Sequence, residues 1–279
     1  MEKNKAVRVF AEEIRVETLK EFAALGFGHV GGAMSIIETL AVLYGGEMRI
    51  DPKNPGWEER DRLVMSKGHA GPALYATLAL KGYFPLDVLK TLNQGGTSLP
   101  SHCDRLKTPG VDMTTGSLGQ GISLACGLAL GNRALGRDAY TYLVLGDGEC
   151  NEGQVWEGAM FAAHFKLCNL IAFVDLNKQQ LDGSCDDVMH MGDMVKKFES
   201  FGWLTCKVDG HNVDAILDAI HAGKQQKDKP VMIILDTVKG NGCEFAMGRF
   251  PNHHIAFTAE EFAPSVQKAE AVLAQVKGE

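Results

Sequence analysis

The sequence predicts an α/β fold in which helices cover both faces of a mostly parallel β-sheet. Short apolar runs rich in β-branched residues recur along the chain, and a dozen or more residues with helical patterns separate them. Crossovers of that length are what parallel strands require. With 279 residues, 45% of them hydrophobic, and no linker or internal repeat, we expect a single domain over residues 1–279.

The N-terminal third reads as helix, helix, strand and helix. The first helix is predicted by apolar residues at steps of three or four, with Gly26 ending the pattern. Ser35 and Glu38 have the spacing of a capping box ahead of a helix over residues 36–44, so we expect residues 26–33 to form a loop. A short strand over 62–65 then leads through Ser66-Lys67-Gly68-His69 to a helix over 71–81.

The remaining strands and helices alternate. Buried parallel strands are predicted at residues 141–145, 170–174 and 231–236, and a shorter, more polar strand at 205–208. Helices are expected over 122–130 and after Glu152. Thr258 and Glu261 have capping-box spacing and predict a final helix that runs towards residue 276.

Composition excludes several classes of function. The net charge of -7 is spread along the chain, which argues against nucleic acid or an anionic membrane surface as a partner. The longest uncharged run, residues 113–132, contains five glycines and several polar residues, so we do not expect a membrane span. The N-terminus has no apolar signal core, and the odd number of cysteines, seven, has no Cys-x-x-Cys pair, which predicts reduced thiols and a cytoplasmic protein.

The strongest chemical signal is one βαβ unit. Gly-Asp147-Gly148 follows the 141–145 strand, and Asn177 follows the next strand thirty residues later. Because a right-handed crossover places both strand ends at one sheet edge, we expect these side chains to face each other. Carboxylate and amide oxygens suit Mg²⁺ or Ca²⁺, and Gly148 lets backbone approach a ligand, so the unit suggests a metal-bridged diphosphate. The alternative is a strand that ends in a turn with a capping aspartate.

Two weaker signals accompany it. The segment 114–121 is rich in glycine and precedes the 122–130 helix; its glycines serve either a ligand or helix packing. Several histidines sit in loops beside glycine or proline, where an imidazole could move protons on sugar hydroxyls or simply be a hydrogen-bonded surface group. These are His29, His69, His102, His253 and His254, whereas His164, His190, His211 and His221 are interpreted as structural.

Taken together, these motifs resemble the N-terminal half of transketolase, the thiamine-diphosphate enzyme that moves two-carbon ketol units between sugar phosphates. The resemblance covers nearly the whole chain. It rests on motifs that are weak singly and specific together: Gly28-His29, Ser66-Lys-Gly-His69, Ser101-His102, Thr-Thr-Gly116-Ser-Leu118-Gly-Gln-Gly, Gly-Asp147-Gly…Asn-Glu152-Gly, Asp-Leu-Asn177-Lys and Lys239-Gly-Asn-Gly242.

The resemblance implies a thiamine diphosphate site with Mg²⁺, or alternatively Ca²⁺ or Mn²⁺. It assigns the metal to Asp147, Asn177 and the Gln179 carbonyl, and positive charge near the diphosphate to Lys67 and Lys239. It assigns His69 and His254 to the diphosphate and reacting carbon, His29 and His102 to the donor sugar's hydroxyls, and Gly116 and Leu118 to the cofactor rings. Glu152 resembles a residue that relays protons across a subunit interface.

Two departures affect the histidines. Val30 stands where the family often has proline, which would loosen the loop that carries His29. Ile255 follows the last histidine where the family has glycine, which leaves His253 and His254 hard to tell apart.

The resemblance also implies a partner. The chain ends where a full-length transketolase would continue into its pyrimidine and C-terminal domains, although the last helix looks like a finished end. We therefore expect a split transketolase that acts with a C-terminal subunit carrying the pyrimidine domain, with self-association into a heterotetramer-like assembly. Alternatives are a subunit of a synthase or 2-oxoacid decarboxylating enzyme, or a non-catalytic cofactor-binding subunit.

Overall fold

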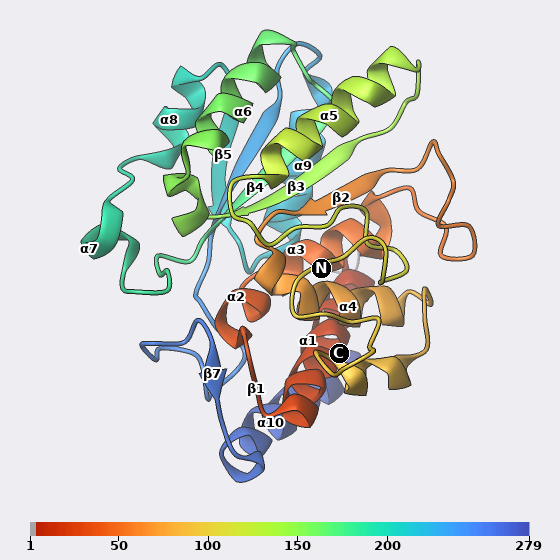
Figure 1. Ribbon diagram of the computed structural model, residues 1–279, viewed down its shortest axis with the longest axis vertical. Coiled ribbons are helices and arrows are strands. Elements are labelled where there is room, and N and C mark those ends of the chain that lie inside the picture. The colour runs from red at the N-terminus through yellow and green to blue at the C-terminus, as the bar shows by residue number, and fades with distance from the viewer. Residues whose placement is uncertain (1–3, 279) are drawn as a thin grey trace.

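The computed structural model describes residues 4–278 and contains the parallel sheet that the sequence predicts (Figure 1). Its strand order is β2-β3-β4-β6-β5, and every neighbouring pair is parallel. All five predicted strands are confirmed, with ends within two residues of those expected. The strands are β2 (Arg62–Met65), β3 (Thr141–Gly146), β4 (Leu170–Leu176), β5 (Leu204–Asp209) and β6 (Val231–Asp236).

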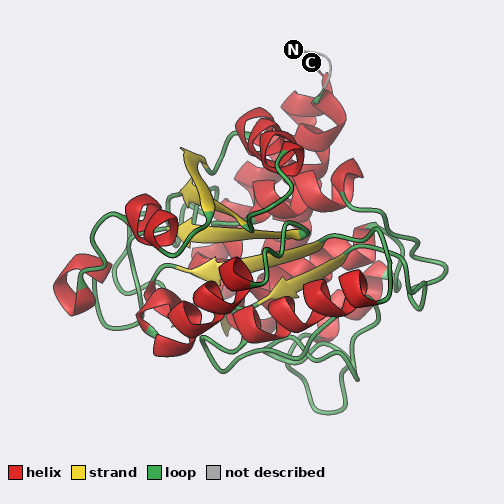
Figure 2. Cartoon of the chain, turned by 90° about the horizontal axis from the view of Figure 1, so that it is seen from above, coloured by secondary structure: helices red, strands yellow, loops and turns green. Residues whose placement is uncertain are grey.

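Helices cover both faces of this sheet (Figure 2). Alternate residues of each strand face opposite cores: Tyr142 and Val144 pack into the core formed with α1, α3, α4 and α9, and Leu143 and Leu145 pack into the core formed with α5, α6 and α8. The helices are α1 (Lys5–Leu25), α2 (Val30–Met34), α3 (Ile37–Val42), α4 (Gly71–Leu80), α5 (Gly121–Ala134), α6 (Gly153–His164), α7 (Cys185–Met189), α8 (Met194–Ser200), α9 (Val213–Gln225) and α10 (Ala259–Gly278).

One capping prediction is wrong and the other is confirmed. The Ser35 hydroxyl does not cap α3; it donates to Asp175 on β4, while Glu38 is drawn to Arg15, so tertiary partners outcompete the local cap. At α10 the capping box forms as expected, with Thr258 N–H donating to Glu261 and Glu261 N–H donating to the Thr258 hydroxyl.

The segment 26–33 is more ordered than the predicted loop. It contains β1 (Phe27–Gly28) and the start of α2. β1 pairs antiparallel with β7 (Ile255–Ala256), with Gly28 opposite Ile255, and so joins two segments more than two hundred residues apart. This pairing has no signature in either two-residue strand.

Two expectations from composition concern the cysteines and membrane spans. All seven cysteines are free thiols, as expected. Among the described residues, we find no helix that combines the length and apolar character of a membrane span.

Candidate active site

The predicted site residues follow the carboxyl ends of four neighbouring strands. Lys67 and His69 follow β2, Asp147 follows β3, Asn177 follows β4, and Lys239 lies three residues beyond β6. Parallel strands end at one edge, and β3 and β4 are in register with Gly146 opposite Asp175. The edge therefore gathers residues from across the sequence, as expected of a ligand site in an open α/β sheet.

The predicted metal ligands form one hydrogen-bonded group at this edge. The Asp147 carboxylate accepts the Lys178 N–H at 2.5 Å and the Gly148 N–H at 2.8 Å. The Asn177 amide oxygen accepts the Gln179 N–H at 3.1 Å, and the Gln179 carbonyl accepts from Lys239 Nζ at 3.2 Å. Within residues 4–278 no three His, Cys, Asp or Glu side chains converge on a metal position. A cation here would thus be held by one carboxylate with amide and carbonyl oxygens, a donor set that suits Mg²⁺.

The charged side chains of this group are buried, and burial shifts two of their pKa values. Burial and the nearby Asp175 raise the pKa of Asp147 to about 6. Burial, with Lys67 close by, lowers the pKa of Lys239 to about 8. A carboxyl group that is hard to ionise and an ammonium that is easily deprotonated both fit a site completed by a cation and an anion.

Sequence reasoning missed Asp175, whose carboxylate accepts hydrogen bonds from several residues of this group. Its side chain is fully buried, and burial alone would raise its pKa, but the Lys67 ammonium at 2.6 Å holds that pKa below its usual value. The same carboxylate accepts from three further donors, Ser35 Oγ at 2.7 Å, Asn177 Nδ2 at 2.6 Å and Thr237 Oγ1 at 2.5 Å. An aspartate inside an otherwise apolar strand was the available signal.

Glu149 was also missed, and it joins three loops of the site. Its carboxylate accepts the Ser66 hydroxyl, the Gly119 N–H at 2.9 Å and the Gly146 N–H at 3.0 Å. The side chain is only 2% exposed. Ser66 precedes Lys67, Gly119 follows Leu118 and Gly146 precedes Asp147, so one carboxylate fixes the relative positions of three predicted cofactor-contacting segments.

The glycine-rich loop packs directly on the segment after β2. A Cβ on Gly68 would lie 2.8 Å from Gly116 N, and one on Gly121 would lie 2.2 Å from Ser66 Oγ, so both positions require glycine. Leu118 is 38% exposed at the tip of the loop. Glu152 is exposed at the N-terminus of α6 and packs beside Gly119.

Five histidines converge beside the loop. His29 is central: its ring centroid lies 5.5 Å from His69, 5.3 Å from His102, 5.3 Å from His253 and 4.7 Å from His254. The β1–β7 pairing brings the last two into place. Burial, reinforced by the other histidines, lowers the pKa of His29 to about 3, so this ring is neutral at pH 7.

The structure separates His253 from His254. The His253 ring lies 4.7 Å from His69, and its Nδ1 is buried without a hydrogen-bond partner. Burial, together with Lys239 and Lys67, lowers its pKa to about 4. His254 is exposed and lies 5.7 Å from the Phe27 ring. His253 thus faces the lysines, and His254 faces the outer side of the histidine group.

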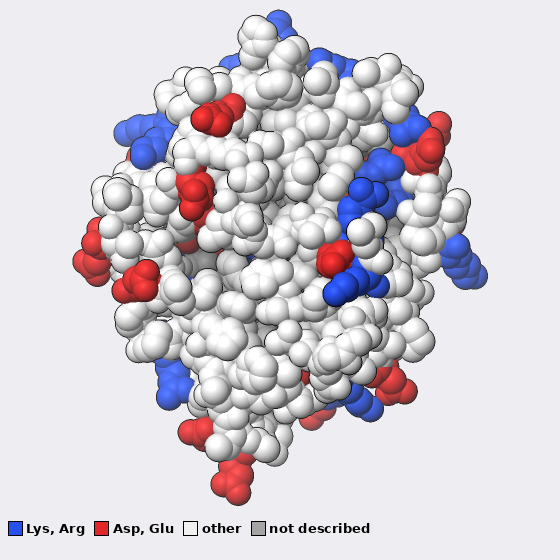
Figure 3. Space-filling model, viewed as in Figure 1, with Lys and Arg blue, Asp and Glu red and all other residues white. Residues whose placement is uncertain are grey.

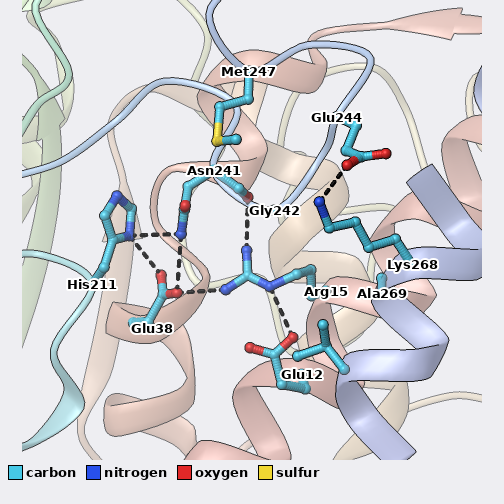
Figure 4. A pocket seen from close by; sticks show the side chains of 11 residues that line it. Glu12, Arg15, Glu38, His211, Asn241, Gly242, Glu244, Met247, Lys268 and Ala269 are labelled. Atoms are coloured by element: carbon cyan, nitrogen blue, oxygen red, sulfur yellow. Dashed lines mark hydrogen bonds and ion pairs between the residues drawn. The ribbon is translucent and has the colours of Figure 1, made fainter. Parts of the chain in front are cut away.

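Hydrogen bonds to Asn241, two residues after Lys239, fix the loop that carries this lysine (Figure 4). Arg15 donates to the Asn241 carbonyl at 2.7 Å and pairs with Glu38. His211 Nε2 accepts the Val238 N–H at 2.9 Å, so its Nδ1 carries the proton and donates to Glu38 at 3.2 Å. His211 therefore supports this loop, in agreement with its interpretation from the sequence as a structural residue.

Comparison with known proteins identifies the family. Residues 6–270 match the family model described as transketolase, thiamine diphosphate binding domain. The chain belongs to this transketolase family. It is 52% identical over 260 residues to the 6-deoxy-6-sulfo-D-fructose transketolase subunit SqwG of Clostridium sp. (strain MSTE9), covering 93% of this chain and 94% of that protein. It is 35% identical over 252 residues to a subunit of the apulose-4-phosphate transketolase of Phocaeicola vulgatus, covering 90% and 89% of the two chains.

Solved transketolases share the fold. A transketolase variant from Pichia stipitis in complex with fructose 6-phosphate superposes with a TM-score of 0.86 at 30% identity, covering 98% of this chain and 46% of that one. A transketolase from Campylobacter jejuni gives 0.85 at 26% identity, covering 100% and 48%. The chain therefore spans about half the length of these transketolases.

Proposed function

We propose that this chain is the N-terminal subunit of a thiamine-diphosphate-dependent transketolase that transfers a two-carbon ketol unit between sugar phosphates. The observation that carries the proposal is the meeting, at one sheet edge, of an oxygen-rich metal-ligand set and a group of five histidines. The metal-ligand set suits the diphosphate of a cofactor, and neutral imidazoles suit the hydroxyls of a sugar.

The described residues fit thiamine diphosphate with a divalent metal. Asp147, Asn177 and the Gln179 carbonyl would hold Mg²⁺, or Ca²⁺ or Mn²⁺ in its place. Lys67 and Lys239 would offset the charge of the diphosphate. Gly148, Gly116 and Leu118 would lie against the cofactor. The unpartnered Nδ1 of His253 supports this fit, because a buried imidazole nitrogen without a partner lacks the hydrogen bond that a ligand supplies.

When bound, the cofactor would supply the carbanion and the electron sink for ketol transfer. The histidines of this chain would place the sugar. Neutral His29 offers one donor and one acceptor nitrogen, and His102 lies against it, so together they would orient two hydroxyls. We assign the proton-handling position near the diphosphate to His69 and His253, and place His254 at its outer edge. This choice rests on the proximity of His253 to His69, whose ring centroids lie 4.7 Å apart.

The proposal includes a partner. SqwG and the apulose-4-phosphate transketolase relative are both named as subunits and are close to this chain in length. A C-terminal subunit with the pyrimidine domain would cover the exposed Leu118 and Glu152, where Glu152 would take part in a proton relay. Self-association, a cytoplasmic location and sugar phosphate substrates belong to the same proposal.

Ketol transfer from a panel of ketose phosphates to aldose phosphates, with thiamine diphosphate and Mg²⁺, tests this function. The chain is assayed alone and after co-expression with the C-terminal subunit, and Asp147→Ala is compared with Asp138→Ala, an exposed aspartate away from the site. We expect turnover only in the mixture, lost in Asp147→Ala and kept in the control. Full activity of Asp147→Ala would refute the metal assignment.

The two alternatives predict other results in the same assay. Turnover of pyruvate without a ketose donor would favour a synthase or decarboxylating enzyme. A partner activity unchanged by His69→Ala or His102→Ala would favour a non-catalytic subunit.

A further inference from the structure

A second charged feature lies outside the histidine group. A cavity of about 590 Å³ is bounded by α5, by the chain leading into β2 and by residues of the 105–113 segment. Figure 3 shows a group of basic side chains on this side of the molecule, where Figure 1 places α5 and β2. The charged residues lining the cavity are four arginines and two acids: Arg60, Arg62, Arg105, Arg137, Glu58 and Asp112.

The two acids neutralise only two of the arginines. Arg60 pairs with the buried Asp112, and Arg137 pairs with Glu58. Arg62 donates only to backbone carbonyls, those of Glu58 at 3.0 Å and Arg60 at 3.3 Å. Within residues 4–278, neither Arg62 nor Arg105 has a carboxylate within 4.0 Å. The cavity therefore has an excess of two positive charges in a chain whose net charge is -7.

These positive charges crowd one another. Burial is the main cause that lowers the pKa of Arg62; the nearby Arg60 and Arg137 lower it further, and Asp112 and Glu58 offset this in part. Like charges held this close favour an anion between them.

A residue that lines the same cavity carries a buried hydrogen-bond donor. Asn132 lines it from α5 and is 4% exposed, and its Nδ2 has no hydrogen-bond partner in the part of the chain that the structure describes. Its backbone is fixed, because the carbonyl accepts the Arg137 N–H at 2.9 Å. A buried amide donor without a partner is uncommon in folded proteins unless a ligand or water satisfies it.

We propose that this cleft binds the phosphate group of a small phosphate monoester, with Arg62 and Arg105 neutralising its charge and Asn132 donating to one oxygen. Guanidinium groups bind phosphate oxygens through paired donors, and the cavity has room for more than the phosphate alone. This site does not depend on the proposed function.

Calorimetric titration of the full chain with inorganic phosphate and with glucose 6-phosphate tests the proposal. We expect saturable binding of both, tighter for the ester, and about tenfold to a hundredfold weaker binding in Arg62→Gln. Arg105→Gln should weaken it less, because Arg105 is more exposed. Lys90→Gln removes one exposed positive charge elsewhere and should leave it unchanged.

Two further variants keep the outcome decisive. Lys239→Gln removes a positive charge from the candidate active site. Phosphate binding that is kept in Lys239→Gln and lost in Arg62→Gln takes place in the arginine-lined cavity. Asn132→Leu should weaken binding while the thermal midpoint of the ligand-free chain is kept or raised, since it removes an unsatisfied buried amide. No saturable binding, or binding lost in Lys239→Gln and retained in Arg62→Gln, would overturn the proposal.

Discussion

Two carboxyl groups are equally buried in different parts of this molecule. Asp175 on β4 is 0% exposed and accepts four hydrogen bonds, one of them from the Lys67 ammonium. Glu21 on α1 is 1% exposed, and neither of its carboxylate oxygens has a partner. Burial by itself raises the pKa of both carboxyl groups. At Asp175 the Lys67 ammonium and the other donors outweigh burial and lower the pKa, so this group is ionised. At Glu21 burial and the nearby Glu17 raise the pKa well above its usual value. Asp175 is thus a buried charge that organises a site, whereas Glu21 is a buried acid whose charged form is disfavoured by burial.

The largest effect is expected at Asp175. In Asp175→Asn the Lys67 ammonium stays buried without a counter-charge, which should lower the free energy of unfolding by about 3–5 kcal/mol. Urea unfolding at pH 7 measures it. Asp236→Asn, at the same edge but partly exposed, removes pairs with Lys178 and Lys207 and should cost less than about 1 kcal/mol. Equal losses in the two variants would contradict the role of Asp175.

Glu21 should behave in the opposite way. Its folded pKa is raised, so its contribution is fully present below the unfolded pKa and is lost as pH rises towards the folded pKa. From pH 5 up to the folded pKa the wild-type chain should lose stability relative to Glu21→Gln by up to about 1.4 kcal/mol per pH unit. Unfolding curves of both proteins across this range measure the difference. A difference that does not change with pH would show that Glu21 is ionised in the fold.

Glu149 extends the comparison to a buried acid that accepts only from neutral donors. In Glu149→Gln the amide nitrogen faces a backbone N–H, of either Gly119 or Gly146, and the loops should separate. If the proposed function holds, affinity for thiamine diphosphate with Mg²⁺ should fall about tenfold to a hundredfold, and turnover at saturating cofactor should largely recover. Titration of the assembled enzyme measures it, with the exposed Glu157→Gln as control. Unchanged affinity would remove Glu149 from the site.

The smallest effect concerns acid sensitivity at the histidines. The pKa of His29 is lowered to about 3, so the folded ring stays neutral while the unfolded ring protonates as pH falls below about 6.5. The wild-type chain should therefore lose stability from pH 6.5 to 5 more steeply than His29→Asn, by up to about 1.4 kcal/mol per pH unit. Unfolding curves of the two proteins at these pH values measure the slopes. Parallel slopes would show that His29 is accessible to protons in the fold.

Much of the fold was predictable because its signals are local. Apolar runs placed four strands of the sheet, a shorter and more polar run placed β5, and Thr258 with Glu261 placed the start of α10. The same local rule failed at Ser35 and Glu38, where Asp175 and Arg15 provide stronger partners. A capping box is reliable only where the chain around it is exposed.

The candidate site was predictable in outline for a related reason. Parallel strands end at one edge, so residues after β2, β3, β4 and β6 had to lie near each other whatever their side chains. That rule led to Asp147 and Asn177, whereas His69 was proposed as a loop histidine and Lys239 only from the resemblance to transketolase. The rule does not predict the positions of His29 and His253, which are brought together by the pairing of β1 with β7.

The sequence by itself determined the parallel sheet, its helices and the edge that carries polar residues, because periodicity and strand direction are properties of short segments. Only the tertiary structure decided that His253 rather than His254 lies beside His69 and that Asp175 and Glu149 bind several segments of the site. It also decided that Arg62 has no acidic partner among the described residues. Each of these features depends on which side chains come into contact in the folded chain. These partners lie 30 to 184 residues apart in the sequence, so no local pattern contains them.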